Sequence, residues 1–116
     1  MNQLFRSVLL LGAISLLPVS VYANASGIVT HQEIVEMTCN KQPKGIKRNA
    51  CFKVEYYQLE YYYDEIFDAI ESDPKAVAAF TKAIRQKDYV NILKYYKRGY
   101  NVYKISGDTY NLPNPN

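Results

Sequence analysis

The sequence predicts a small, mainly α-helical domain closed by one disulfide, because three of its features agree. Apolar side chains recur at helical spacing through most of residues 31–98. Side chains typical of helix N-termini precede three of these segments. The two cysteines of the chain, Cys39 and Cys51, lie at the facing ends of the first two segments. We expect about four helices, arranged as two helical hairpins, followed by a short C-terminal β-hairpin.

The first 25 residues are typical of a cleavable secretory signal. Arg6 supplies a positive charge, an apolar run follows over residues 8–17, and Ala23 and Ala25 form an A-x-A pattern. We expect cleavage after Ala25, or alternatively after Ala23. The apolar run is shorter than the roughly 20 residues that cross a bilayer, so we expect no transmembrane anchor after cleavage, with a retained anchor as the alternative.

Export also decides what the cysteines do. In an oxidising compartment the pair Cys39 and Cys51 predicts a disulfide, which stabilises a small domain by about 2–4 kcal/mol. A metal site would need more ligands, and the only histidine, His31, stands alone. We therefore expect a periplasmic rather than extracellular protein, with no bound metal or cofactor. Its parts would be a signal over residues 1–25, one domain over residues 26–112 and a disordered tail over residues 113–116.

Two helices are expected in the first half of the exported chain. Thr30 and Glu33 match a capping box, so a helix is predicted over residues 31–39. Residues 40–49 contain proline and glycine and predict a loop. The longest helix is predicted over residues 50–71, where apolar side chains recur at spacings of 4, 3, 4, 3 and 4. Its expected core stripe consists of Phe52, Tyr56, Leu59, Tyr63, Ile66 and Ile70.

Two further helices are expected in the second half. Asp73 followed by Pro74 is typical of an N-cap and a first-turn proline, and predicts a helix over residues 74–86. Asp88 predicts the cap of a fourth helix over residues 89–98. Their expected core side chains are Val77, Phe80, Ile84, Ile92, Leu93 and Tyr96.

The pattern changes after this helix. Gly99 is suited to the left-handed residue that ends a helix. Residues 100–105 and 109–112 flank Ser-Gly-Asp, a tight-turn sequence, and predict the two strands of the hairpin.

Charges are segregated along the chain, whose net charge is +3. Residues 41–53 hold five bases and no acid, residues 55–73 hold seven acids and no base, and residues 75–104 are again mostly basic. The segments either neutralise each other when helices pack side by side, or leave surfaces of one sign that steer a partner. Export and the acidic middle argue against a nucleic-acid partner.

Residues 80–102 resemble the helical pair of an ankyrin-type repeat. The pattern is Phe80, then Ala83-Ile84, a turn opening on Lys87-Asp88, a second amphipathic helix, and Gly99 before an extended Asn101-Val102. Lys87 stands where the repeat has a turn glycine. The resemblance implies protein binding rather than catalysis.

The sequence contains no evident catalytic constellation. A nucleophile–base pair would need His31 beside a serine or free cysteine, and His31 is expected in the first turn of a capped helix. Asp64, Glu65 and Asp68 supply carboxylates for a glycosidase only if another element faces them, and acids on one helix usually form a solvated stripe. We expect a protein that is not an enzyme.

Tyrosine is abundant, with 12 residues in the chain and no tryptophan. On the long helix, Tyr57, Tyr61, Asp64 and Asp68 are predicted to share a face away from the core stripe. Exposed tyrosine is favoured in recognition surfaces, so this tyrosine–acid face is the predicted partner-binding site. Alternatively it packs on the fourth helix or the hairpin, with lysines 94 and 97 and arginine 98 answering the acids.

These observations predict an exported protein-binding module whose partner is another protein. An inhibitor or immunity-type protein for a toxin or cell-wall hydrolase suits the size, the disulfide and the acidic tyrosine face. The alternatives are a small secreted effector, toxin or lytic enzyme, and a structural envelope component. A secondary basic surface is predicted on the loop of Lys41, Lys44, Lys47 and Arg48.

Overall fold

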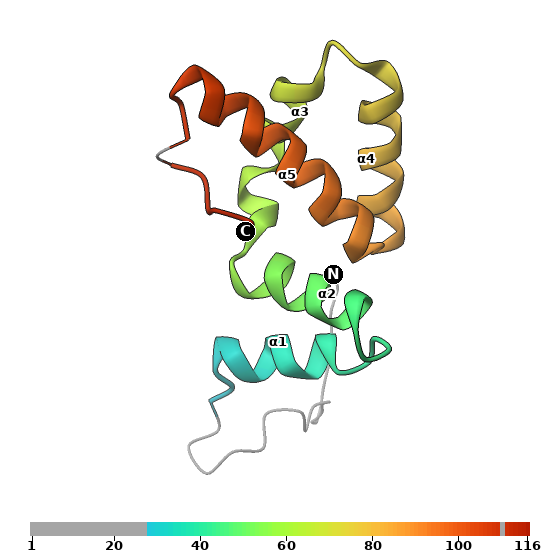
Figure 1. The fold of residues 1–116 in the computed structure, drawn as a ribbon. Coiled ribbons are helices and arrows are strands. Elements are labelled where there is room, and N and C mark those ends of the chain that lie inside the picture. The colour runs from blue at the N-terminus through green and yellow to red at the C-terminus, as the bar shows by residue number, and fades with distance from the viewer. Residues whose placement is uncertain (1–27, 110) are drawn as a thin grey trace, which may run out of the picture. The chain divides into compact units, whose positions relative to one another are not determined.

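The computed structural model of the protein describes residues 28–109 and 111–116, so the predicted signal lies outside the described residues. Within that part the chain is mainly helical, as predicted, and contains no β-strand (Figure 1). It divides into two units, residues 1–33 and 34–116. The elements are α1 (His31–Cys39), α2 (Ile46–Tyr56), the 3-10 helix η2 (Leu59–Tyr62), α3 (Tyr63–Ile70), α4 (Pro74–Gln86) and α5 (Tyr89–Ser106).

The predicted capping box at the start of α1 is formed. The Thr30 amide donates to Oε1 of Glu33 (2.9 Å), and the Glu33 amide donates to Oγ1 of Thr30 (3.1 Å). The Thr30 hydroxyl also donates to Oε1 of Glu33 (3.0 Å), and the hydrogen bonds from the Thr30 amide and hydroxyl lower the pKa of the Glu33 carboxyl, since they favour its charged form.

The predicted disulfide is also present, and it joins the last residue of α1 to the middle of α2. Cys39 and Cys51 have Cα atoms 5.5 Å apart, and both residues are fully buried. The second helix begins at Ile46, earlier than predicted. No side chain caps it, and its N-cap is Gly45 at φ +105°, a conformation that glycine adopts without strain, so the sequence carries no capping signal there.

The prediction of one long helix over residues 50–71 is wrong. The chain leaves α2 at Tyr57, Gln58 adopts the left-handed conformation (φ 53°), and η2 and α3 follow. The segment contains neither glycine nor proline to signal the break. Leu59 is fully buried, as predicted, whereas Tyr56, which was also predicted in the core, is 51% exposed at the end of α2.

The starts of α4 and α5 are as predicted. The Asp73 carboxylate accepts hydrogen bonds from the amides of Lys75 and Ala76, and Asp88 accepts one from the amide of Asn91. Between these helices Lys87 takes the left-handed conformation (φ 55°). The amides of Lys87 and Asp88 then donate to the carbonyls of Ile84 and Ala83, which satisfies the C-terminal turn of α4.

The predicted end of the fourth helix at Gly99 and the predicted C-terminal hairpin are wrong. Helix α5 continues to Ser106 and ends at Gly107, which is left-handed (φ 86°). Gly99 lies inside the helix at a close approach to α3, because a Cβ atom there would come within 2.9 Å of the Ile66 side chain. Residues 100–105 are therefore helical, and Asn101 and Val102 lie in α5 rather than in an extended segment.

Helix α5 is the centre of the second unit and contacts α2, α3 and α4. Figure 1 shows α5 running diagonally past α3, with α4 on one side and α2 below it. Phe80 of α4 is fully buried, and its ring lies 5.2 Å from that of Tyr63, 4.8 Å from Phe67 and 6.3 Å from Tyr95. This aromatic cluster joins α3, α4 and α5.

Residues 113–116, for which the sequence predicts a disordered tail, contact the helices. Pro115 is fully buried, and the Tyr96 hydroxyl donates to the Pro113 carbonyl (3.2 Å). Lys53 of α2 donates to the Pro115 carbonyl (3.1 Å). The segment therefore covers part of α2 and α5.

Candidate partner-binding segment

Three tyrosines lie exposed at the bend between α2 and η2. Tyr56, Tyr57 and Tyr61 are 51%, 52% and 70% exposed. The rings of Tyr56 and Tyr57 meet edge to face, with centroids 5.2 Å apart. The Tyr61 amide donates to the Gln58 carbonyl (3.2 Å), so Tyr61 belongs to the same bend.

The predicted acids follow on α3. Asp64 and Asp68 are exposed and lie four residues apart, so they share one side of that helix. Tyr61 precedes Asp64 by three residues, whereas Tyr57 is separated from them by the left-handed Gln58. The four predicted site residues are all exposed, but they are not on one continuous helix. We call the exposed side chains of Tyr56, Tyr57, Tyr61, Asp64 and Asp68 the tyrosine–acid segment.

A small cavity lined by residues of α2, η2, α3, α4 and α5 was not predicted from the sequence. Its volume is about 250 Å³, and its polar lining comprises Glu55, Glu60, Tyr63, Lys87 and Tyr89. Drug-sized ligands occupy sites of roughly 300–1,000 Å³, so the cavity is too small for such a ligand.

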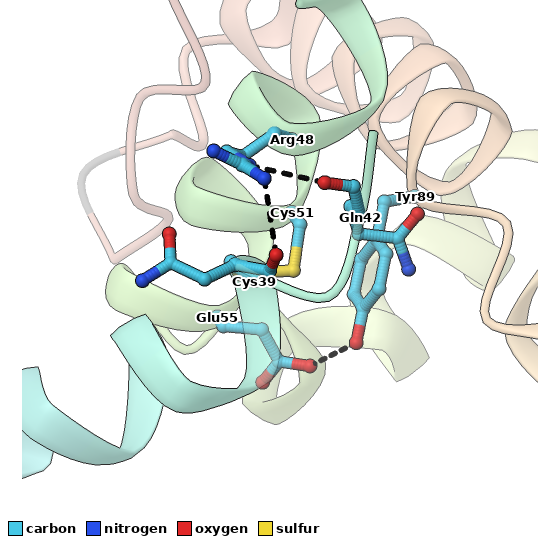
Figure 2. The surroundings of a disulfide bond; sticks show 7 residues. Cys39, Gln42, Arg48, Cys51, Glu55 and Tyr89 are labelled. Atoms are coloured by element: carbon cyan, nitrogen blue, oxygen red, sulfur yellow. Dashed lines mark hydrogen bonds between the residues drawn. A yellow bond between two sulfur atoms is a disulfide. The ribbon is translucent and has the colours of Figure 1, made fainter. Parts of the chain in front are cut away.

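A short hydrogen bond between two lining side chains of this cavity joins α2 to α5. The Tyr89 hydroxyl donates to Oε2 of Glu55 at 2.6 Å (Figure 2). Burial raises the pKa of Tyr89, and the hydrogen bond and negative charge of Glu55 raise it further. Burial, with the charges of Glu60 and Glu55, likewise raises the pKa of Tyr63. Both hydroxyls therefore stay protonated at neutral pH, and Tyr89 acts as a hydrogen-bond clamp between two helices.

In the basic loop, Arg48 forms hydrogen bonds within the chain, whereas the three lysines are exposed. Nε of Arg48 donates to the Gln42 carbonyl and Nη2 donates to the Asn40 carbonyl, each at 3.0 Å, beside the disulfide (Figure 2). Arg48 therefore closes the loop between α1 and α2. Lys41, Lys44 and Lys47 are exposed.

The acidic and basic segments neutralise each other at a single ion pair. Among residues 55–104, all of which the structure describes, that pair joins Nη2 of Arg98 to Oδ2 of Asp73 at 2.8 Å. The Arg98 guanidinium, with the N-cap amides, lowers the pKa of Asp73. Within the same range Lys94 and Lys97 form no ion pair with the acids.

His31 lies in the first turn of α1 and is exposed. No group of three or more histidine, cysteine, aspartate or glutamate side chains is placed to hold a metal ion within the described chain. None of the helices over residues 28–109 and 111–116 is long and apolar enough to cross a bilayer.

Comparison of the chain with protein-family models, with curated proteins and with solved structures found no match. The ankyrin-type resemblance of residues 80–102 stays a prediction. The residues of the chain itself therefore carry the functional proposal.

Proposed function

We propose that the protein is an exported, non-enzymatic binding module that contacts another protein through the tyrosine–acid segment. The observation that carries the proposal is the gathering of three exposed tyrosines at one bend of a small domain. Large aromatic side chains favour water-excluded interfaces, and a partner surface would bury them.

The character of these side chains suits recognition. Tyrosine supplies a large contact area at a low cost in side-chain entropy, and it is enriched among residues that dominate binding energy. Asp64 and Asp68 follow on α3 and carry charge that accelerates association with a basic surface. The partner surface that fits this segment is thus basic at its rim and apolar at its centre. An inhibitor or immunity-type role against a toxin or cell-wall hydrolase suits such a module.

The basic loop is the less suitable surface. Lys41, Lys44 and Lys47 supply charge, but the loop carries no aromatic anchor, and its neighbour Arg48 is occupied by the loop itself. Rim charges chiefly change association rate and salt dependence.

Export forms part of the proposal and has its own test. The sequence pattern of residues 1–25 and the disulfide both support an oxidising compartment. Intact-mass measurement of protein from the envelope fraction should show loss of the first 25 or 23 residues. A full-length mass would contradict cleavage.

The binding proposal is tested by capturing a partner from envelope extract and then titrating the purified partner. Tyr61→Ala should weaken binding by about 2 kcal/mol, roughly 30-fold, because an aromatic anchor is lost. The matched control is Ile105→Ala, which removes another highly exposed apolar side chain, near the end of α5. Helical circular dichroism and thermal melts establish that both variants fold.

The double variant Lys44→Ala with Lys47→Ala addresses the competing surface. It should reduce the salt dependence of binding and leave most of the affinity in place. If this variant abolishes binding and Tyr61→Ala is silent, the basic loop is the true contact. If Tyr61→Ala unfolds the domain, its ring is a core side chain and the proposal fails.

A further inference from the structure

A second surface, opposite in charge to the tyrosine–acid segment, lies between α2 and α5. It is a groove of about 460 Å³. Ala50 of α2 with Val90 and Leu93 of α5 supply apolar lining. Ile46 adds an apolar side chain that is 76% exposed.

Three lysines border this apolar lining. Lys53 comes from α2, and Lys94 and Lys97 come from α5, so positive charge stands on both walls. No acidic side chain of the described residues lines the groove, and none there forms an ion pair with the three lysines. Lys53 donates to the main-chain oxygens of Pro115 (3.1 Å) and Asn116 (3.4 Å), so its ammonium group is engaged by the C-terminal segment. Nζ of Lys94 lies 5.4 Å from the centre of the Tyr95 ring.

The groove is open on its solvent side, and this decides which ligand suits it. A small amphiphile lying there would keep much of its apolar surface in water. A protein segment would cover the groove with its own backbone and neighbouring side chains. Carboxylates complement the lysines, and one apolar side chain complements the lining.

We infer that this groove binds an acidic protein segment in which one large apolar side chain is flanked by carboxylates. The apolar side chain would contact Val90, Leu93 and Ile46, and the carboxylates would pair with Lys94 and Lys97. This binding site is independent of the tyrosine–acid segment and gives the protein a second partner surface.

The test is a titration of the isotopically labelled, disulfide-bonded protein with a peptide, in which NMR chemical-shift changes of the backbone amides report binding. The probe is the capped peptide Glu-Glu-Leu-Glu-Glu. Two control peptides carry glutamine in place of every glutamate, or serine in place of leucine. The acidic peptide should shift amides of α2 and α5 around the groove, and both control peptides should bind much more weakly. Absence of these shifts with the acidic peptide overturns the inference.

Variants then assign the contact to the groove. Lys94→Gln with Lys97→Gln should weaken peptide binding roughly tenfold, the combined effect of two exposed ion pairs. Lys75→Gln with Lys104→Gln removes the same charge away from the groove and should change affinity less than twofold. Ile46→Ser should weaken binding severalfold, because it removes exposed apolar lining without touching the core. Equal losses in the two lysine pairs would show a general charge effect and overturn the inference.

Two further measurements exclude other occupants. In the first, vesicles of anionic phospholipid are mixed with the wild type and with the Lys94–Lys97 variant. If the vesicles bind only the wild type and the acidic peptide binds neither protein, the groove is a membrane contact. Sedimentation that shows concentration-dependent association, lost in the same variant, would assign it to a second copy. Either result overturns the acidic-segment inference.

Discussion

The substitution Gly99→Ala tests how α5 packs on α3. A Cβ atom at this position would lie 2.9 Å from Cδ1 and from Cγ2 of Ile66, and 3.3 Å from its Cα. Ile66 is fully buried, so its side chain has no room to move away, and the close approach to its main chain would require the backbone of α3 to shift. Alanine gains about 1 kcal/mol over glycine in helix propensity, whereas overpacking costs about 1–3 kcal/mol.

Because both side-chain distances lie below 3.0 Å and the backbone is also close, the cost should fall at the upper end of that range. We therefore expect Gly99→Ala to lower the free energy of unfolding by about 1–2 kcal/mol. For a domain of this size each 1 kcal/mol corresponds to about 4–8 °C in Tm. Thermal and urea melts followed by circular dichroism measure both quantities.

The double variant Gly99→Ala with Ile66→Ala checks the stated cause. Ile66→Ala alone should cost about 2–5 kcal/mol, but it also removes the atoms with which the new methyl group collides. The double variant should therefore be less destabilised than the sum of the two single changes, by about 1 kcal/mol. Gly107→Ala is the control, because nothing lies within 4 Å of its Cβ position and its cost comes from φ alone. A stabilised Gly99→Ala, or additive costs in the double variant, would refute the packing argument.

Two further predictions concern the disulfide and the two tyrosines at the small cavity, Tyr63 and Tyr89. Cys51→Ser should lower the free energy of unfolding by about 3 kcal/mol, as expected for a closed loop whose ends are 12 residues apart. Tm should fall by on the order of 10 °C or more. Thiol labelling of the unfolded, unreduced wild type should find no reactive cysteine. The pKa values of Tyr63 and Tyr89 are raised, so the folded state keeps protons that the unfolded chain loses near pH 10. The free energy of unfolding should therefore stay constant up to about pH 10 and fall above it, because the unfolded chain then loses protons that the folded state keeps. The fall should be less steep in Tyr89→Phe, and a Tm that is constant up to about pH 11 would contradict the prediction.

The parts of the fold that the sequence predicted depend on short-range interactions. Thr30 with Glu33, and Asp73 with Ala76, form hydrogen bonds within a single helical turn, so the starts of α1 and α4 follow from neighbouring residues. The end of α5 was predicted wrongly because Gly99 and Gly107 both follow amphipathic segments. The two glycines differ in a way that the local sequence does not show. Gly99 permits close packing against Ile66, which is distant in the sequence, whereas Gly107 ends the helix.

The candidate binding segment was predicted in part for the same reason. Helical spacing separated Tyr57 and Tyr61 from the core side chains, and both are exposed in the structure. The same spacing assigned Tyr56 to the core, but α2 buries Ala50, Cys51 and Val54, which lie on the side of the helix away from Tyr56. The contact between Tyr89 and Glu55 spans 34 residues, and no pattern along the chain indicates it.

The break at Gln58 connects the fold to the proposed function. A non-glycine residue in the left-handed conformation costs about 1–2 kcal/mol, and such strain persists only where surrounding contacts impose it. Here the burial of Leu59 and the clamp between Glu55 and Tyr89 stand on either side of the break. Tyr56 is the last residue of α2, whose buried side chains are Ala50, Cys51 and Val54, so Tyr56 lies on the opposite side of that helix. The break at Gln58 ends α2 there and begins η2, which contains Tyr61, so the strained residue stands among the three exposed tyrosines on which the proposed binding depends.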